Sequence, residues 1–156
     1  MQVVIQRVQR AAVTVGDEVS GRIGPGLLAL VGVGRHSTEA DAAWLASKTV
    51  ALRVFGDDAG RMNRSVADVG GAVLAVSQFT LYGDVSRGRR PSFVDAADPA
   101  DGQRLYEAYC AAITVPVAKG VFGAHMVIDL IADGPVTMLL RRETLRPVGQ
   151  DMRWPR

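Results

Sequence analysis

Runs rich in β-branched and other apolar residues alternate with short glycine-rich breaks along this chain, a pattern typical of a strand-rich protein. The first run covers residues 3–15 and predicts one long strand with an irregularity near Arg10. A turn over 16–18 returns the chain as a hairpin partner over 19–23, and 27–33 reads as a further buried strand.

The central run, residues 70–76, carries no charge and begins at two glycines, so we expect a strand buried on both faces. It changes abruptly into Ser77-Gln78-Phe79-Thr80, and a glycine-rich, cationic loop follows over 82–91. Polar groups at the carboxyl end of a buried strand, beside a basic loop, are where a rigid scaffold presents a site. Taken alone, the same residues also fit hydroxyls that cap neighbouring backbone groups.

Two segments have the apolar spacing of amphipathic helices, and each follows a capping residue. Ser37 or Thr38 caps the first, and Asp98, followed by Pro99, caps the second. We expect Cys110 in the second helix to serve packing and not nucleophilic chemistry. The predicted core-facing residues are Ala42, Leu45, Thr49 and Leu52, then Leu105, Tyr109, Ala112 and Ile113.

The remaining segments predict shorter or interrupted strands. Residues 53–55 suggest a short strand, and Pro116 restricts 115–117 to an edge strand or a loop. Residues 121–131 predict a long strand that Asp133-Gly134-Pro135 turns into a partner over 136–140. We therefore expect a single domain over 1–143, followed by a basic, poorly ordered tail over 144–156.

Composition narrows the class of protein. A length of 156 residues with 48% hydrophobic and 22% charged residues fits one globular domain. Cys110 is the single cysteine, which excludes an internal disulfide and fits a reducing compartment. Because no run has the length and apolarity of a membrane span, we expect a cytoplasmic protein without a membrane partner.

The cations are almost all arginine, since Lys48 and Lys119 are the only lysines. Arginine suits phosphate recognition, although codon bias in a GC-rich genome would explain the total equally well. The clustering of arginines is better evidence for phosphate binding than their total number. Arg87, Arg89 and Arg90 gather on the loop after the central strand, where they predict a surface for a polyanion.

The sequence lacks the motifs of several well-known metal-binding, nucleotide-binding and catalytic sites. No CxxC or HExxH pattern occurs, and His36 and His125 lie far apart, so we expect neither a metal nor a cofactor. Residues 32–37 imitate a dinucleotide-binding loop but lack its third glycine. A Ser-His-Asp arrangement stays open, but no GxSxG elbow supports it.

Five segments, in order, resemble the D-aminoacyl-tRNA deacylase family, first described as D-tyrosyl-tRNA deacylases. Together they span roughly residues 1–140, and their combination is far more specific than any one of them. The chain departs from many relatives at Ala132, where they have asparagine, and at Met138, where they have phenylalanine. The matching segments are Ile5-Gln6-Arg7-Val8, Met62-Asn63, Ser77-Gln78-Phe79-Thr80-Leu81, Arg90-Pro91-Ser92-Phe93 and Asp133-Gly134-Pro135-Val136-Thr137.

The resemblance implies an α+β fold: a compact, barrel-like, mostly antiparallel sheet with two main helices outside, assembled as a homodimer. It implies hydrolysis of the ester between a D-amino acid, or glycine, and the 3′-terminal adenosine of tRNA. L-Aminoacyl-tRNA would be spared, which makes the activity a chiral proofreading step.

The resemblance also assigns roles to residues. Ser77, Gln78, Phe79 and Thr80 would form the catalytic segment, with backbone N–H groups binding the oxyanion. Thr80 as a direct nucleophile stays open, as does assistance by the RNA 2′-hydroxyl. Gly134 and Pro135, as a cis dipeptide, would enter the partner's pocket and reject L-amino acids. Supporting roles would fall to Arg7, Met62, Asn63, Val136 and Thr137, and tRNA contacts to Arg87, Arg89 and Arg90.

Two other functional classes fit the same residues. A nucleic-acid-binding module would use the basic loop without cleaving anything. A serine- or threonine-based esterase would act on small substrates as readily as on charged tRNA. Deacylation assays separate all three.

Overall fold

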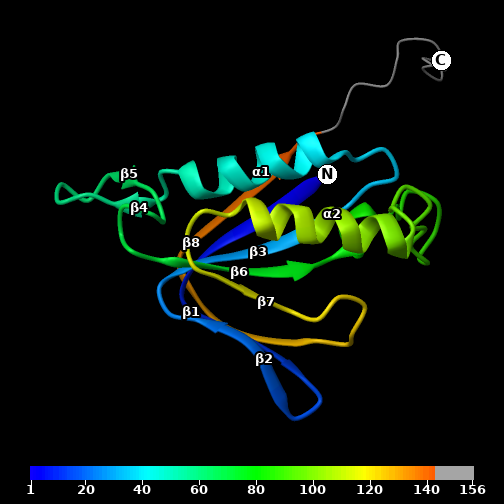
Figure 1. The fold of residues 1–156 in the computed structure, drawn as a ribbon, viewed down its shortest axis with the longest axis horizontal. Helices are drawn as coiled ribbons and strands as arrows, with labels where there is room; N and C mark the ends of the chain where they lie inside the picture. Colours follow the sequence, from blue (N-terminus) through cyan, green and yellow to red (C-terminus); the bar gives the residue numbers. More distant parts are fainter. Residues whose placement is uncertain (143–156) are drawn as a thin grey trace.

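One curved, mixed sheet and two helices make up residues 1–142, the part of the chain that the computed structural model describes (Figure 1). The sequence-based expectation of a basic tail over 144–156 lies outside these residues. The elements, in order, are β1 (Gln2–Val15), β2 (Glu18–Ile23), β3 (Gly26–Gly32), α1 (Glu39–Ala51), β4 (Phe55–Gly56), β5 (Met62–Arg64), β6 (Ala72–Ser77), the 3₁₀ helix η1 (Phe79–Tyr82), α2 (Pro99–Ala112), β7 (Val117–Lys119) and β8 (Val127–Arg141).

Strand β1 organises the sheet. It pairs antiparallel with β2, β3 and β8, while β3–β6 and β6–β7 are parallel pairs. The strand order is β2-β1-β3-β6-β7, with β8 also on β1. The two ends of this path, β2 and β7, come into contact, so the sheet is nearly closed into a barrel. The α+β, barrel-like and mostly antiparallel fold is therefore confirmed.

The central strand β6 is buried on both faces, as its uncharged run predicts. Val73 and Ala75 join the core between sheet and helices, whereas Leu74 and Val76 join a second core on the opposite face. This is the period-two alternation of a strand that is covered on both sides. Site residues that follow directly on β6 thus begin from a firmly held backbone.

The irregularity expected near Arg10 changes the face that β1 buries. Val3 and Ile5 belong to the helix-side core, but Ala11 and Val13, which have the same odd spacing, belong to the opposite core. The pairing with β8 shifts register between Gln6 and Val8 and again between Val8 and Arg10. Because a one-residue shift reverses the side-chain alternation, β1 serves both cores.

Helices α1 and α2 lie side by side over one face of the sheet (Figure 1). Thr38 caps α1 through a capping box with Asp41, and Asp98 caps α2 with Pro99 in its first turn, as predicted. Tyr106 and Cys110 are buried alongside the predicted Leu105 and Tyr109. None of the helices within residues 1–142 is long and apolar enough to cross a membrane.

The expected strand over 121–131 is wrong in its boundaries. Residues 121–126, including His125, form a loop, and β8 begins only at Val127. The expected hairpin turn at Asp133-Gly134-Pro135 is also wrong, because β8 continues to Arg141 along β1. Only Arg7 separates the partners of Thr137 and Ala132 on β1, so residues 133–136 form a bulge within one strand. One long strand pairs with both halves of β8, and no turn is needed.

The buried hydroxyl pair between the helices gives a stability prediction. Thr49 Oγ1 donates to Leu45 O at 2.8 Å and lies 2.9 Å from the Tyr109 hydroxyl. Tyr109→Phe removes one hydrogen bond and should cost about 0.5–1.5 kcal/mol of unfolding free energy, whereas Thr49→Val strands a buried hydroxyl and should cost about 1–3 kcal/mol. Urea unfolding measures both. The double variant should recover stability relative to Thr49→Val, and a larger cost for Tyr109→Phe than for Thr49→Val would contradict this account.

Candidate active site

The chain leaves β6 at Ser77 and enters the 3₁₀ helix η1 after Gln78. Gln78 N donates to Val31 O at 2.8 Å, which fastens the start of this segment to β3. The Gln78 side-chain amide donates to Thr80 Oγ1 through Nε2. Phe79 is 58% exposed and packs edge-on against Phe93, with the ring centroids 5.0 Å apart. The four predicted catalytic residues therefore form one short segment, half-buried at Ser77 and Gln78 and exposed at Phe79 and Thr80.

Two backbone donors on this segment are free. The first N–H groups of a 3₁₀ helix have no partner within the helix. Those of Phe79 and Thr80 donate to no other group among residues 1–142. Thr80 Oγ1 contacts no carboxylate or imidazole in the described chain, since its one hydrogen-bond partner there is the Gln78 amide. The segment offers N–H donors to an oxyanion but provides Thr80 with no general base.

A pocket of about 360 Å³ opens beside this segment. Its wall includes Val31 of β3, Val33 just after that strand, and the rings of Phe79, Phe93 and Phe122. Tyr106 lies at its buried side and donates to Ala75 O at 2.9 Å, and burial raises the pKa of its hydroxyl well above the usual value. The size and the apolar, aromatic lining suit a flat ring or a small side chain. Sequence reasoning missed the pocket, because its walls come from five separate segments and 121–126 was expected to be a strand.

The basic loop projects next to the pocket. A backbone bridge between Asp84 and Ser92 closes the loop at its base, and Arg87, Arg89 and Arg90 are exposed. Hydrogen bonds from the Ser86 backbone N–H and hydroxyl lower the pKa of Asp84, which keeps one negative charge in the loop. Three arginines against one aspartate leave the loop cationic at neutral pH.

A second group of predicted residues gathers around Arg7. Its Nε donates to Asp133 O at 3.2 Å and lies 3.0 Å from Asp133 Oδ2, and Nη1 donates to Val54 O. The guanidinium also lies 6.0 Å from the centre of the Phe55 ring. The Arg7 side chain is only 14% exposed. One cation thus joins β1, the β8 bulge and the start of the β4–β5 hairpin.

The bulge presents Gly134 and Pro135 to solvent. Their peptide bond is cis, and Gly134 has φ +123°, a conformation that residues with side chains rarely adopt. Val136 and Thr137 follow in β8, with Thr137 paired to Gln6. Met62 and Asn63 lie nearby on β5, whose hairpin partner Phe55 contacts Arg7. Arg7, Val136 and Thr137 therefore belong to this second group, and Met62 and Asn63 are connected to it through the β4–β5 hairpin.

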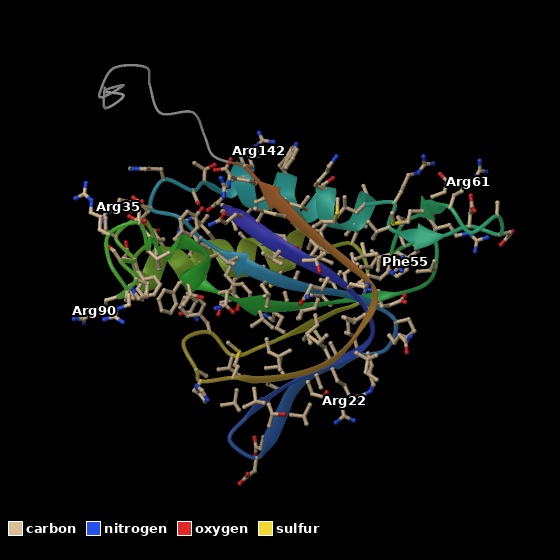
Figure 2. The ribbon with its side chains drawn as sticks, turned by 180° about the vertical axis from the view of Figure 1, so that it is seen from behind. Arg22, Arg35, Phe55, Arg61, Arg90 and Arg142 are labelled. Carbon is tan, nitrogen blue, oxygen red and sulfur yellow. The ribbon has the colours of Figure 1, made fainter. Side chains whose placement is uncertain are left out.

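Within one chain the two groups do not meet. Arg7 of β1 pairs with Leu27 of β3, whereas Ser77 of β6 pairs with Val31 of β3. Leu27 and Val31 are separated by about 13 Å along the strand. Figure 2 shows Phe55 and Arg61 at one end of the molecule and Arg90 at the other. The two groups are therefore separate clusters within the chain.

Other candidate groups are placed elsewhere. Burial raises the pKa of the Cys110 thiol to about 11, so it stays protonated at neutral pH and packs in the core. His125 lies in the 121–126 loop, remote in sequence from His36 in the loop before α1. In the described part of the chain, no three His, Cys, Asp or Glu side chains gather as metal ligands would.

Comparison with known proteins decides the family. The family model described as D-Tyr-tRNA(Tyr) deacylase matches residues 4–141. The chain belongs to the D-Tyr-tRNA(Tyr) deacylase family. A D-aminoacyl-tRNA deacylase of Deinococcus radiodurans is 54% identical over 143 residues, covering 90% of this chain and 99% of the relative. One from Thermus aquaticus is 55% identical over 143 residues, covering 90% and 94%.

Solved structures agree with this membership. A c-Myc DNA unwinding element binding protein has a TM-score of 0.87 and 35% identity, covering 92% of this chain and all of the other. A probable eukaryotic D-amino acid tRNA deacylase has a TM-score of 0.74 at 18% identity, covering 89% and 97%. At that identity the second likeness speaks for the fold alone. The family resemblance stated from the motifs is confirmed.

The Arg7 cluster of this deacylase-family chain generates a prediction. Arg7→Gln removes the half-buried partner of Asp133 and the donor to Val54 O, and should lower the unfolding free energy by about 1–3 kcal/mol. Arg10→Gln is the matched control, because Arg10 pairs with Asp129 across the same strands at 54% and 66% exposure. Such exposed pairs contribute about 0–1 kcal/mol.

Chemical denaturation measures the two losses of stability. Hydrogen exchange should also speed up at residues 133–136 in Arg7→Gln and stay unchanged in Arg10→Gln. Equal losses for the two variants, with no change of exchange in the bulge, would mean that Arg7 does not hold it.

Proposed function

We propose that this protein is a D-aminoacyl-tRNA deacylase, which hydrolyses the ester between a D-amino acid or glycine and the 3′-terminal adenosine of tRNA. Family membership over residues 4–141 supports the reaction class. The structural observation that carries the proposal is the pair of free backbone N–H groups at Phe79 and Thr80, at the mouth of an apolar pocket. A tRNA substrate would place the activity in the cytoplasm, within a catalytic domain over 1–143.

In this proposal the hydrolysis of the aminoacyl ester depends mainly on the backbone N–H groups of Phe79 and Thr80. Water attacks the ester carbonyl carbon, and the carbonyl oxygen becomes an oxyanion that the N–H groups of Phe79 and Thr80 stabilise. The bond to the ribose 3′-oxygen then breaks, that oxygen takes a proton, and a free amino acid and tRNA leave. The ribose 2′-hydroxyl lies next to the ester and assists in positioning the water or the proton. Thr80 has no base beside it, which favours this route over attack by its hydroxyl.

The pocket binds the terminal adenosine in this proposal. Its aromatic residues, Phe79, Phe93 and Phe122, offer faces and edges against which a purine can stack. With the base in the pocket, the ribose and its ester lie over the Ser77–Thr80 segment. The cationic loop with Arg87, Arg89 and Arg90 then faces the phosphates of the same RNA.

The chiral filter comes from a second copy of the chain. Gly134 and Pro135 are exposed on β8, and only one side of β8 is paired within residues 1–142. Met138 and Leu139, on the same strand, are 43% and 56% exposed, and an uncovered apolar edge of this length favours association. In a two-fold dimer, the Gly134-Pro135 bulge of each protomer enters the partner's site. Its backbone leaves room for hydrogen at the α-carbon and none for an L side chain.

One alternative function has a specific observation behind it. The relative with 35% identity is described as a DNA unwinding element binding protein, and the basic loop here is compatible with nucleic-acid binding alone. A pure binding module would protect the aminoacyl ester from hydrolysis. An esterase for small substrates would instead cleave simple D-amino-acid esters as fast as charged tRNA.

The central test compares D-, L- and glycyl-tRNA as substrates of the purified protein. We expect hydrolysis of the D- and glycyl-esters and none of the L-ester above the spontaneous rate. Thr80→Ala should keep most of this activity, because the peptide N–H survives. Phe79→Pro should lower kcat by roughly 10²–10³ relative to Phe79→Ala, since both lose the ring but only proline loses the donor. Equal kcat values for these two variants, or an aminoacyl-threonine trapped at Thr80, would rule out the backbone mechanism.

Mixed dimers test the shared active site. Gly134→Val should be inactive as a homodimer, because a Cβ there would lie 2.9 Å from Val136 N at a strained φ. Phe79→Pro disables the other half. A mixed dimer of these two variants should regain about half of the wild-type activity, because one of its sites then has two intact halves. Mixed dimers that stay inactive would place both halves of a site in one chain, and so would a monomeric enzyme with full chiral discrimination.

A further inference from the structure

Arg35 is an exposed arginine that belongs to none of the family motifs and to neither group of site residues. It forms no ion pair and no side-chain hydrogen bond within the described residues, unlike Arg7, Arg10 and Arg104. Figure 2 shows Arg35 at the same end of the molecule as Arg90, opposite Arg61. An unpaired guanidinium beside the proposed RNA site is available to a phosphate.

The backbone around Arg35 is firmly held. Ser37 N donates to Gly34 O at 3.0 Å, and Gly34 N donates to Ser37 Oγ at 3.0 Å, which closes a tight turn. Arg35 N donates to Asp95 O at 2.9 Å. The side chain therefore starts from a fixed position, and ordering it on a ligand costs only its own rotamer freedom.

This turn is packed directly onto the pocket's structure. Gly34 pairs with Ala96, a residue of the pocket wall, and Val33, also in the wall, accepts from Ala97 N at 3.0 Å. A Cβ on Gly34 would lie 2.6 Å from the Tyr82 ring, so the absence of a side chain lets the turn sit against η1. Arg35 is thus two residues beyond the pocket wall and fixed relative to the catalytic segment.

We propose that Arg35 binds a backbone phosphate of the single-stranded 3′ end of tRNA, at the terminal or the preceding nucleotide. This inference rests on the proposed function, because it takes the terminal base to be in the pocket. The turn that carries Arg35 adjoins the pocket wall, so a nucleotide bound in the pocket leaves its own 5′-phosphate at the end of the molecule where Arg35 lies. Arg87, Arg89 and Arg90 lie on a loop that projects beyond the Asp84–Ser92 bridge and reach the more distant, paired part of the RNA.

Three substrates of increasing length separate these contacts. They are a D-aminoacyl ester of adenosine, which has no phosphate, a D-aminoacyl trinucleotide with the tRNA 3′ sequence, and the full D-aminoacyl-tRNA. Arg35→Gln should raise KM several-fold for the trinucleotide and the tRNA and leave the adenosine ester unchanged. The triple alanine variant at 87, 89 and 90 should affect only the full tRNA. With the trinucleotide, Arg35→Gln should also reduce the slope of log affinity against log salt by about 0.7.

Two control variants accompany this series. Arg22→Gln removes the same charge from an exposed arginine on β2, on another side of the molecule, and should change no KM (Figure 2). Arg35→Lys keeps the charge at the fixed turn and should retain most of the affinity. If the short esters are cleaved too slowly to measure, the same contact can be tested with the trinucleotide that carries no amino acid. Its ability to compete with D-aminoacyl-tRNA should then fall in Arg35→Gln.

The outcomes are distinct. An equal defect of Arg35→Gln on the phosphate-free ester would mean a distorted site and would overturn the phosphate contact. A defect on full tRNA alone would move Arg35 to the paired region, and no defect on any substrate would remove it from the interface. A wild-type protein that cleaves none of the D-esters would instead refute the proposed function itself.

Discussion

The backbone hydrogen bonding of β1 is the constraint on which this structure depends. One strand of 14 residues, Gln2–Val15, pairs with β3 and β2 along one edge and with β8 along the other. Since a strand paired along both edges uses its N–H and C=O groups in hydrogen bonds on either side, its partners are fixed in register. Arg7 adds a side-chain contact at the middle of this strand and fastens the β8 bulge and Val54 to it.

The same strand explains why the two groups of site residues are rigid and yet separate. The carboxyl end of β6, which pairs with β3, presents Ser77–Thr80, while the middle of β1, at Arg7, holds the bulge that presents Gly134 and Pro135. In the proposed dimer each site combines two rigid halves from different chains, so that the substrate's two faces meet preformed backbone. Discrimination between mirror-image amino acids requires such rigidity, because a side chain that moved away would let both forms bind.

Much of this architecture follows from the sequence, and the failures have physical causes. The caps at Thr38 and Asp98, the buried strand before Ser77 and the irregularity near Arg10 depend on local patterns, and all three appear as expected. The residues Asp133-Gly134-Pro135 favour a turn locally, but pairing of the segments on both sides of them with β1 keeps them within one strand. The pocket escaped detection because Phe93, Phe122 and Val33 converge only in the folded chain. Arg35 belongs to no recognisable motif. Its position depends on the hydrogen bond from its backbone N–H to Asp95 O and on the packing of Gly34 against Tyr82.

The reversal of buried faces in β1 limits how this family member can change in length. Ile5 points into one core and Ala11 into the other, and the number of residues between them sets that assignment. Exchanging one apolar residue for another in this stretch alters packing at a single position. Inserting or deleting one residue there would turn Ala11 and Val13 away from their core together, and would displace Arg7 or the strand that follows it. The spacing between Ile5 and Ala11 is therefore under a stricter requirement than the identity of the residues that fill it.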